Sequence, residues 1–201
     1  MVAEDILFQA FKAYELLNRR AFVVTLSTGY AFILSFKSEN FKHLVGIQHL
    51  KDIEPSRFSA GQIYRLVRSH VLTEATLRKS SFFEDSSMRI LDFQRLPEIF
   101  RENALVIPAF NSARTGAKIR GDILIYEEDQ YRIFLTLSCC RECVVLADGV
   151  KRDSYVPESF MSESTDRLIR GQQRARITAL REIPKESVRP VKNAGSRPMN
   201  K

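Results

Sequence analysis

Hydrophobic side chains recur with the period of an α-helix at the start of the chain and form strand-like runs directly after it. Within the first 20 residues they fall on one helical face, at Leu7, Ala10, Phe11, Tyr14 and Leu17. Because residues three and four apart lie on the same side of a helix, this pattern predicts an amphipathic N-terminal helix. The apolar runs 21–26 and 31–36 follow, and the turn at Gly29 between them predicts a β-hairpin.

The middle of the chain is more polar and has the spacing and the start signals of helices. Ser38 is placed like an N-cap and opens a predicted helix over 39–51. Further helices are predicted over 60–70, 74–81 and 91–101. Residues with N-cap chemistry in this region are Ser59, Thr73 and Ser87.

From residue 104 the apolar runs become β-branched and aromatic and are separated by turns. The predicted strands are 104–110, 119–126, 131–138, 143–149 and 175–183. The stretch 152–173 is polar, with a short predicted helix at 165–170. This order predicts an α+β fold in which N-terminal helices and a hairpin pack on a small antiparallel β-sheet. We expect one domain over residues 1–183 and a disordered basic tail over 184–201.

Composition and charge narrow the class of protein. The 201 residues are 44% hydrophobic and 27% charged, as in ordinary globular proteins. No apolar run reaches the ~18 residues of a membrane span, and the N-terminus has acids where a secretory signal has bases, so we expect a cytoplasmic protein without a membrane partner. The net charge is +7, but the predicted tail holds five basic residues and one acid and so carries +4 of it. Nucleic acid stays open as a partner, because local clustering matters more than the sum.

The cysteines and glycines supply no established cofactor motif. Cys139, Cys140 and Cys143 lie in one patch that contains a single C-x-x-C element, whereas a structural zinc site needs four ligands. Reduced cysteines at a strand end are therefore the favoured interpretation. Neither a glycine-rich phosphate loop nor a serine-hydrolase motif occurs, so we expect no nucleotide cofactor and no metal.

Two of the three histidines lie in the segment NFKHLVGIQHL, residues 40–50. His49 is six residues beyond His43, which on a continuous helix turns it far from His43, whereas a metal-binding pair needs a spacing of four. His49 is therefore assigned to the helix surface. His43 is flanked by Lys42 and backed by apolar residues, a setting that would lower its pKa toward that of a useful base. A packing histidine and a general acid–base residue are both consistent with this pattern.

Basic residues in the strand-rich half are candidates for phosphate binding. The loop 111–122 carries Lys118 and Arg120, and the segment SYVPESF (154–160) places Tyr155 and Ser159 around a proline. Arginines also cluster near the end of the fold, at Arg167, Arg170, Arg174, Arg176 and Arg181. Arginine can clamp a phosphate with two hydrogen bonds, although each of these residues is equally consistent with a solvated surface.

The segment FKSENFKHLVGIQHLKDI (36–53) resembles the F…NF.HL.G…L.DI stretch of phage-associated predicted nucleases. These belong to the fourth phage group of the barnase–EndoU–colicin E5/D–RelE superfamily. A second similarity is AKIRGDILIY (117–126), followed by a hydrophobic strand and YVPESF (155–160). Val45 departs from the small or hydroxyl residue expected at its position.

The resemblance implies a metal-independent ribonuclease built from N-terminal helices on a small antiparallel sheet. In this hypothesis His43 is the general acid or base, Lys118 stabilises phosphate charge, and Ser159 hydrogen-bonds the phosphate or ribose. The residues assigned to substrate binding are Lys42, Arg120, Tyr155 and Arg174. An inhibitor or immunity protein would then be a partner. The alternatives are a non-catalytic nucleic-acid- or protein-binding module of phage origin and a degenerate domain without activity.

Overall fold

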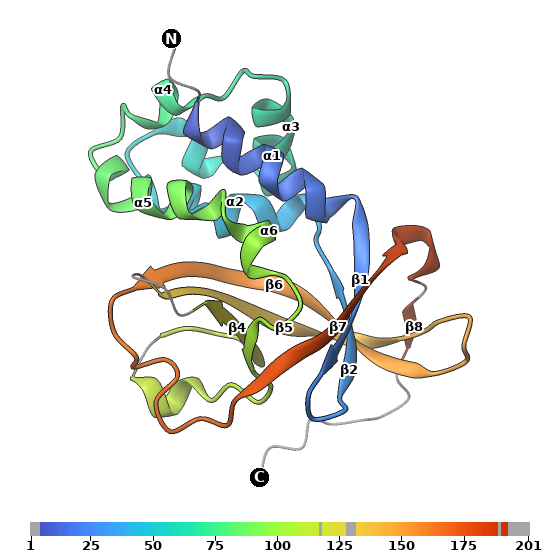
Figure 1. Cartoon of the computed structure of the whole chain (residues 1–201). Helices are drawn as coiled ribbons and strands as arrows, with labels where there is room; N and C mark the ends of the chain where they lie inside the picture. The colour runs from blue at the N-terminus through green and yellow to red at the C-terminus, as the bar shows by residue number, and fades with distance from the viewer. Residues whose placement is uncertain (1–4, 117, 128–131, 189, 193–201) are drawn as a thin grey trace.

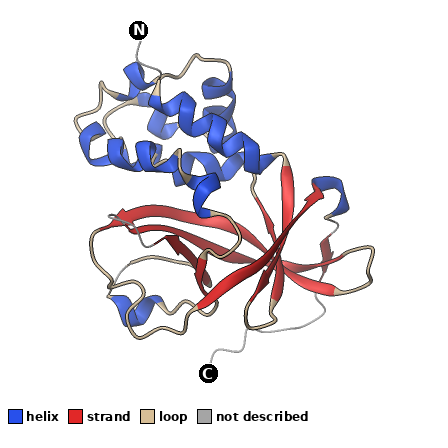
Figure 2. Cartoon of the chain, viewed as in Figure 1, coloured by secondary structure: helices blue, strands red, loops and turns tan. Residues whose placement is uncertain are grey.

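The helices and the strands occupy separate halves of the molecule (Figure 1) in the computed structural model, which describes residues 5–116, 118–127, 132–188 and 190–192. Figure 2 shows the helical layer above and the strands below. The helices are α1 (Ile6–Asn18), α2 (Phe41–Leu44), α3 (Ala60–Arg68), α4 (Glu74–Leu77), α5 (Phe83–Phe93) and α6 (Leu96–Ile99). The strands are β1 (Arg20–Leu26), β2 (Ala31–Ser35), β3 (Leu105–Ile107), β4 (Ile123–Glu127), β5 (Arg132–Val145), β6 (Lys151–Glu163), β7 (Ala175–Pro184) and β8 (Pro190–Lys192).

The N-terminal helix and the hairpin form as their sequence patterns predict. In α1 the carboxylate of Asp5 accepts a hydrogen bond from the backbone N–H of Phe8, which caps the helix. All five predicted core residues of this helix are buried. Strands β1 and β2 pair in antiparallel register, and Gly29 between them adopts a φ of 84°. Both predictions are confirmed.

The middle helices are confirmed in part. Ser59 caps α3 by accepting from the N–H of Gln62, and Thr73 is the N-cap residue of α4. Ser87 lies inside α5, so its assignment as a cap is wrong. The predicted helix 39–51 is also wrong as a single element. It is divided into a 3-10 turn η1 (Ser38–Asn40), α2 and a second 3-10 turn η2 (Ile47–His49).

Gly46 causes this division. It lies between α2 and η2 with a φ of 85°, a left-handed conformation that costs a residue with a side chain about 1–2 kcal/mol. The chain therefore changes direction at Gly46, and the positions before and after it no longer follow one helical period.

The strands form a closed barrel. Seven of the strands in the described part of the chain follow one another around a ring in the order β4, β3, β7, β1, β2, β6 and β5, and a β4–β5 pairing closes it. Strands β2 and β6 are parallel, through Ile33–Ser154 and Leu34–Tyr155, and the other neighbours in the ring are antiparallel. The fold prediction of a small antiparallel sheet under N-terminal helices is therefore wrong, because the strands form a mixed barrel.

The strand that the sequence pattern missed is β6, which occupies much of the polar stretch 152–173. Its sequence contains a proline and few adjacent apolar residues, both unfavourable signals for a strand. Pro157 is tolerated because it lies beyond the two residues that pair with β2, and a register shift against β5 occurs at the same place. Residues 165–170, predicted as a short helix, form bends and turns.

Strand β5 joins two predicted strands, 131–138 and 143–149, through the cysteine patch. Its register with β6 shifts between Cys140 and Cys143, so the residues between them form a bulge. The far end of β5 also pairs with β8. The predicted disordered tail is thus ordered in part: Lys185 donates from its ammonium to Asn18 Oδ1 (2.8 Å) and the Phe36 carbonyl (2.6 Å), and residues 193–201 lie outside the described residues.

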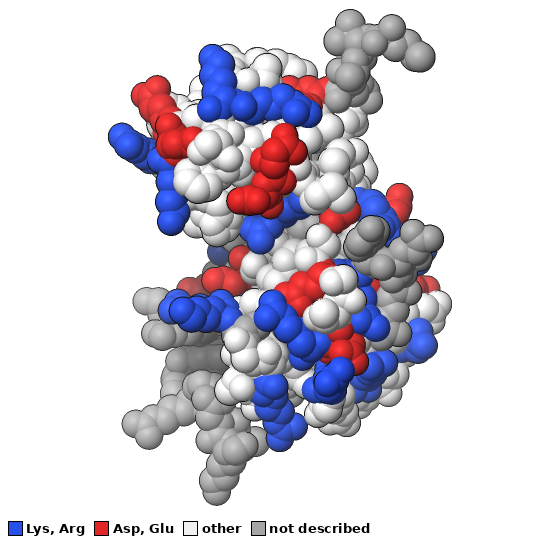
Figure 3. Space-filling model, turned by 90° about the vertical axis from the view of Figure 1, so that its left-hand side faces the viewer, with Lys and Arg blue, Asp and Glu red and all other residues white. Residues whose placement is uncertain are grey.

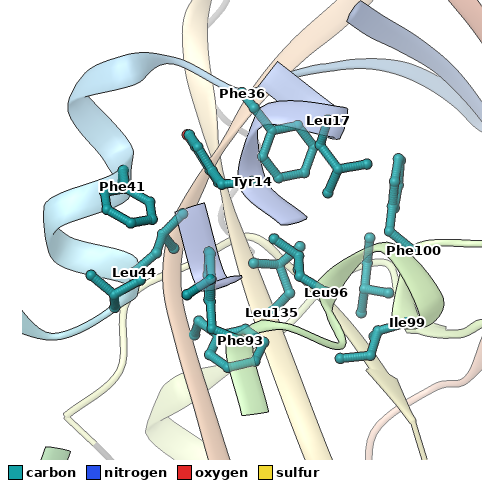
Figure 4. Packing of buried hydrophobic residues seen from close by; sticks show 14 of the residues in the cluster. Tyr14, Leu17, Phe36, Phe41, Leu44, Phe93, Leu96, Ile99, Phe100 and Leu135 are labelled. Atoms are coloured by element: carbon teal, nitrogen blue, oxygen red, sulfur yellow. The ribbon is translucent and has the colours of Figure 1, made fainter. Parts of the chain in front are cut away.

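One hydrophobic cluster continues from the helical layer into the barrel. Aromatic rings make this connection: Phe93 of α5 packs edge-on against Phe160 of β6 with ring centres 4.9 Å apart. Figure 4 shows Tyr14, Phe41, Phe93 and Leu135 among the side chains of this cluster. The shared core fixes the helical layer on one side of the barrel. No helix in the described part of the chain has the length and apolar character that crossing a membrane requires.

Candidate active site

A cleft of about 710 Å³ lies where the helical layer meets the barrel. Its helical side is lined by Asn40, His43, Gln48, His49 and Arg89. Its barrel side is lined by residues 116 and 118–120 of the loop before β4, by the second half of β6 and by Arg167. A volume of this size is typical of sites that hold a small ligand or a nucleotide unit.

The turn at Gly46 builds the helical side of the cleft. His43 comes from α2 and is exposed, while the neighbouring Leu44 and Val45 are fully buried and fix the segment to the core. After Gly46 the chain returns through η2, which brings His49 to the same cleft. The amide of Gln48 joins the two histidines, since its Nε2 lies 3.2 Å from the His43 carbonyl oxygen and 3.1 Å from His49 Nε2.

The barrel side is held by a close approach of the loop to β5. A Cβ atom at Gly121 would lie 2.8 Å from Thr136 Cβ, so only glycine fits there. The next residue, Asp122, accepts from the backbone N–H of Cys139 through its carboxylate (2.7 Å). These contacts fix the base of the loop that carries Lys118 and Arg120.

The cleft has a positive balance of charge. Its cations are Arg89, Lys118, Arg120 and Arg167, and its carboxylates are Glu158 and Glu163. Arg167 is neutralised by Glu163, to which its Nε donates at 2.7 Å. Figure 3 shows the corresponding side of the molecule, where Lys and Arg side chains lie on both sides of the waist between helices and barrel, with acidic side chains among them.

The structure brings four of the predicted site residues together. His43, Lys118, Arg120 and Ser159 all line the cleft, although they come from α2, the 118–120 loop and β6. Lys118 and Arg120 are exposed and Ser159 is half-buried. Their roles in catalysis and substrate binding remain predictions.

The other three predicted substrate-binding residues lie elsewhere. Lys42 is only 8% exposed, and its ammonium donates to the carbonyls of Ser56 (2.8 Å) and Phe58 (2.5 Å), so it joins α2 to the segment 56–58. Tyr155 is 7% exposed and bonds to the hydroxyl of Tyr30. Arg174 is exposed just before β7 and is not a cleft residue.

Sequence reasoning missed His49 and Arg89. His49 was assigned to a helix surface on the assumption that the helix continues through residue 46. Partial desolvation, followed by the charges of Arg89 and Lys51, lowers the pKa of His49 below its usual value. The signal that would have found His49 is Gly46, a residue favoured at helix ends. Arg89 lies outside every predicted helix and had no comparable signal.

The cysteine patch lies apart from the cleft. Desolvation and the carboxylates of Asp153 and Asp122 raise the pKa of Cys139 to about 11, so its thiol is protonated near neutral pH. Cys143 is buried and its sulfur lies 3.3 Å from Asp153 Oδ1. Within the described ranges, no group of three or more His, Cys, Asp or Glu side chains is arranged to hold a metal ion.

Comparison with protein families gives one match. The model of the phage-Barnase-EndoU-ColicinE5/D-RelE like nuclease4 family matches residues 6–175. The chain therefore belongs to this family of phage-associated nucleases. Comparisons with curated proteins and with solved structures gave no match. The matched range contains every cleft residue named above and ends at the start of β7.

Proposed function

We propose that the protein is an endoribonuclease that cleaves RNA without a metal, by attack of a ribose 2′-hydroxyl on the adjacent phosphorus. The observation that carries this proposal is the meeting of His43, Lys118 and Ser159 in one cleft of a nuclease-family chain. A histidine can move the protons of this reaction, a cation can stabilise the charge on the phosphate, and a hydroxyl can hydrogen-bond the phosphate or ribose. The expectation of cytoplasmic action and of an inhibitor or immunity protein belongs to the same proposal.

In the proposed reaction His43 acts as the general acid or base. As a base it takes the proton of the 2′-hydroxyl, whose oxygen then bonds to phosphorus while the bond to the 5′-oxygen breaks. The leaving 5′-oxygen takes a proton from water, and the products are a 2′,3′-cyclic phosphate and a 5′-hydroxyl. Lys118 opposes the added negative charge on the phosphate, and Ser159 donates to a phosphate or ribose oxygen. Arg120 at the mouth of the cleft holds the backbone.

The direct test is cleavage of a mixed-sequence RNA by the purified protein in EDTA. We expect cleavage by the wild type, and a rate about 10²–10⁴-fold lower for His43→Ala, the usual contribution of general acid–base catalysis. His70→Asn is the matched control. His70 is exposed in the helical layer with a φ of 57°, which asparagine tolerates, and it is not a cleft residue.

The chemistry of the ends separates this mechanism from others. Transesterification leaves a cyclic phosphate, and an RNA with a 2′-deoxy residue at the cut site resists cleavage. Cleavage that needs added Mg²⁺, or equal cleavage of the deoxy substrate, would contradict the proposal. RNA that stays intact but binds in a salt-sensitive manner would instead indicate a binding module.

A further inference from the structure

Arg89 is a partly buried cation for which the described part of the chain supplies no partner. Its side chain extends from α5 to the cleft and is half-buried. It forms no hydrogen bond or ion pair with any residue that the structure describes. Arg167, another arginine of this cleft, is by contrast neutralised by Glu163. A guanidinium that is drawn out of water without compensation costs stability, so its position calls for an anion that is supplied from outside.

Gly46 makes room for the Arg89 side chain. A Cβ atom at position 46 would lie 3.1 Å from Arg89 Cδ and 3.2 Å from Arg89 Nη1. The same atom would lie 3.6 Å from His49 Cδ2. The guanidinium of Arg89 and the imidazole of His49 therefore both pack close to the backbone of Gly46. The fold keeps these two side chains near each other.

The hydrogen bonds of Gln48 define the tautomer of His49. The His43 carbonyl can only accept, so the side-chain atom of Gln48 that contacts it is the amide nitrogen. The same nitrogen lies 3.1 Å from His49 Nε2, which must then accept. The proton of a neutral His49 is consequently on Nδ1. The low pKa of His49 agrees with this state.

We propose that Arg89 and neutral His49 form a phosphate-binding subsite on the helical side of the cleft, distinct from the group formed by His43, Lys118 and Ser159. The guanidinium presents two N–H donors to two phosphate oxygens, and His49 Nδ1–H donates to one of them. That the phosphate belongs to an RNA strand rests on the proposed function. The affinity for a phosphate oxyanion rests on Arg89 and His49 alone.

The test follows the histidine ring signals by NMR while inorganic phosphate is added to the wild-type protein at constant ionic strength, with chloride as the reference anion. We expect the His49 signals to shift, because an anion beside Arg89 opposes the positive charge that lowers the pKa of His49. The pKa of His49 should rise in phosphate, and the signals of His70 should stay in place. The charged and titratable groups around His49 are Arg89, Lys51, His43 and, across the cleft, Lys118, Arg120 and Glu163.

Two variants make the test specific. Arg89→Gln should weaken phosphate binding at His49 by about tenfold or more, the effect of losing a charge-assisted hydrogen bond. Arg170→Gln removes the same charge from an exposed residue that pairs with Asp166 outside the cleft, and should leave binding unchanged. Gln48→Leu removes the donor to His49 Nε2, so it should raise the pKa of His49 and change its tautomer ratio. A merely structural role for Gln48 would change neither.

The outcomes separate this inference from the proposed function. His49 signals that ignore phosphate, or that shift equally in Arg89→Gln, would overturn the subsite even if RNA is cleaved as proposed. Phosphate binding that depends on Arg89 supports the subsite even if the wild type leaves RNA intact in EDTA.

Discussion

The two halves of β6 carry two polar clusters of opposite character. The first half, with Asp153 and Tyr155, faces Tyr30 at the β2–β6 junction, and we call these three side chains with Cys143 the closed cluster. The second half, with Ser159, lines the cleft. One strand thus contributes to a cluster of side chains that hydrogen-bond to each other and to a set of side chains that line an open cleft.

The hydrogen bonds between the two tyrosine hydroxyls and Asp153 have a defined direction. Tyr30 donates its hydroxyl proton to Asp153 Oδ2 at 2.9 Å, so the contact of 3.1 Å between the two hydroxyls must be a donation from Tyr155 to Tyr30. Burial raises the pKa of Tyr30 and raises that of Tyr155 to about 12. Both hydroxyls therefore stay protonated near neutral pH and act as structural donors.

The polar groups of the cleft do not all pair with each other in this way. Arg89 has no partner among the residues described, and the Oε1 atom of Gln48 is buried there without a hydrogen bond. The comparison shows that the chemical type of the side chains alone does not separate a candidate site from a structural cluster. A carboxylate occurs in both settings, Asp153 in the closed cluster and Glu158 in the cleft, and what distinguishes the settings is whether neighbours in the fold already use the polar groups.

The largest contrast is expected between Tyr155→Ala and Ser159→Ala. Removal of the Tyr155 ring, which packs against Phe32 with centres 5.1 Å apart, should lower the free energy of unfolding by about 3–5 kcal/mol, as for other large buried aromatics. Ser159→Ala should change stability by less than about 0.5 kcal/mol and should lower RNA cleavage at least about tenfold. Denaturant unfolding and cleavage by the folded protein measure the two effects.

Tyr155→Phe is the control for this contrast. It keeps the ring and removes one buried hydrogen bond, so we expect a loss of about 1 kcal/mol in stability and normal cleavage. If Tyr155→Phe abolished cleavage while leaving stability intact, Tyr155 would be a site residue, as the sequence first predicted, and the distinction between the two halves of β6 would fail.

Local patterns in the sequence were sufficient to predict elements that bury only one of their faces. Helix α1 shows this best, because its five apolar positions form a stripe that leads directly to the buried face. The β1–β2 hairpin also follows, since Gly29 supplies the backbone conformation that the turn requires. In both, the signal lies within a few consecutive residues.

The closure of the barrel could not be predicted in this way. It depends on β6, which pairs with β2 across more than a hundred residues of chain and has a polar, proline-containing sequence. Residues of its second half line the cleft, and their polar character hides the alternation of a strand. The polar residues 151–154 at its start have the same effect.

The candidate site was predictable only through the family resemblance. Lys118, Ser159 and His43 were grouped by similarity, and nothing in their spacing places them in one cleft. Lys42 shows the limit of such inference: its charge suggested phosphate binding, but its buried ammonium donates two hydrogen bonds to the carbonyls of Ser56 and Phe58. Arg89 had no sequence signal, because the feature that sets it apart is the lack of a carboxylate partner among the residues that the structure describes.

The next contrast compares two glycines with nearly the same backbone conformation. Gly46 and Gly29 have φ values of 85° and 84°, so alanine at either position should cost about 1–2 kcal/mol of stability. A Cβ at Gly29 would meet no atom within 4 Å, whereas one at Gly46 would press on Arg89. Of the two variants, only Gly46→Ala should therefore weaken RNA binding in addition to lowering stability. Equal RNA affinity in the two variants, at equal stability, would show that the seating of Arg89 does not matter.

The smallest effect separates two exposed arginines that the sequence assigned to the same role. Arg120 lines the cleft and Arg174 does not. In the His43→Ala background, where RNA stays intact, Arg120→Gln should reduce the slope of log affinity against log salt concentration by about 0.7, the value for one phosphate contact to a single strand. Arg174→Gln makes the same change of charge and should leave the slope unaltered. A reduced slope in both variants would mean that the RNA path extends beyond the cleft to the start of β7, and that the basic surface of the barrel binds as one continuous track.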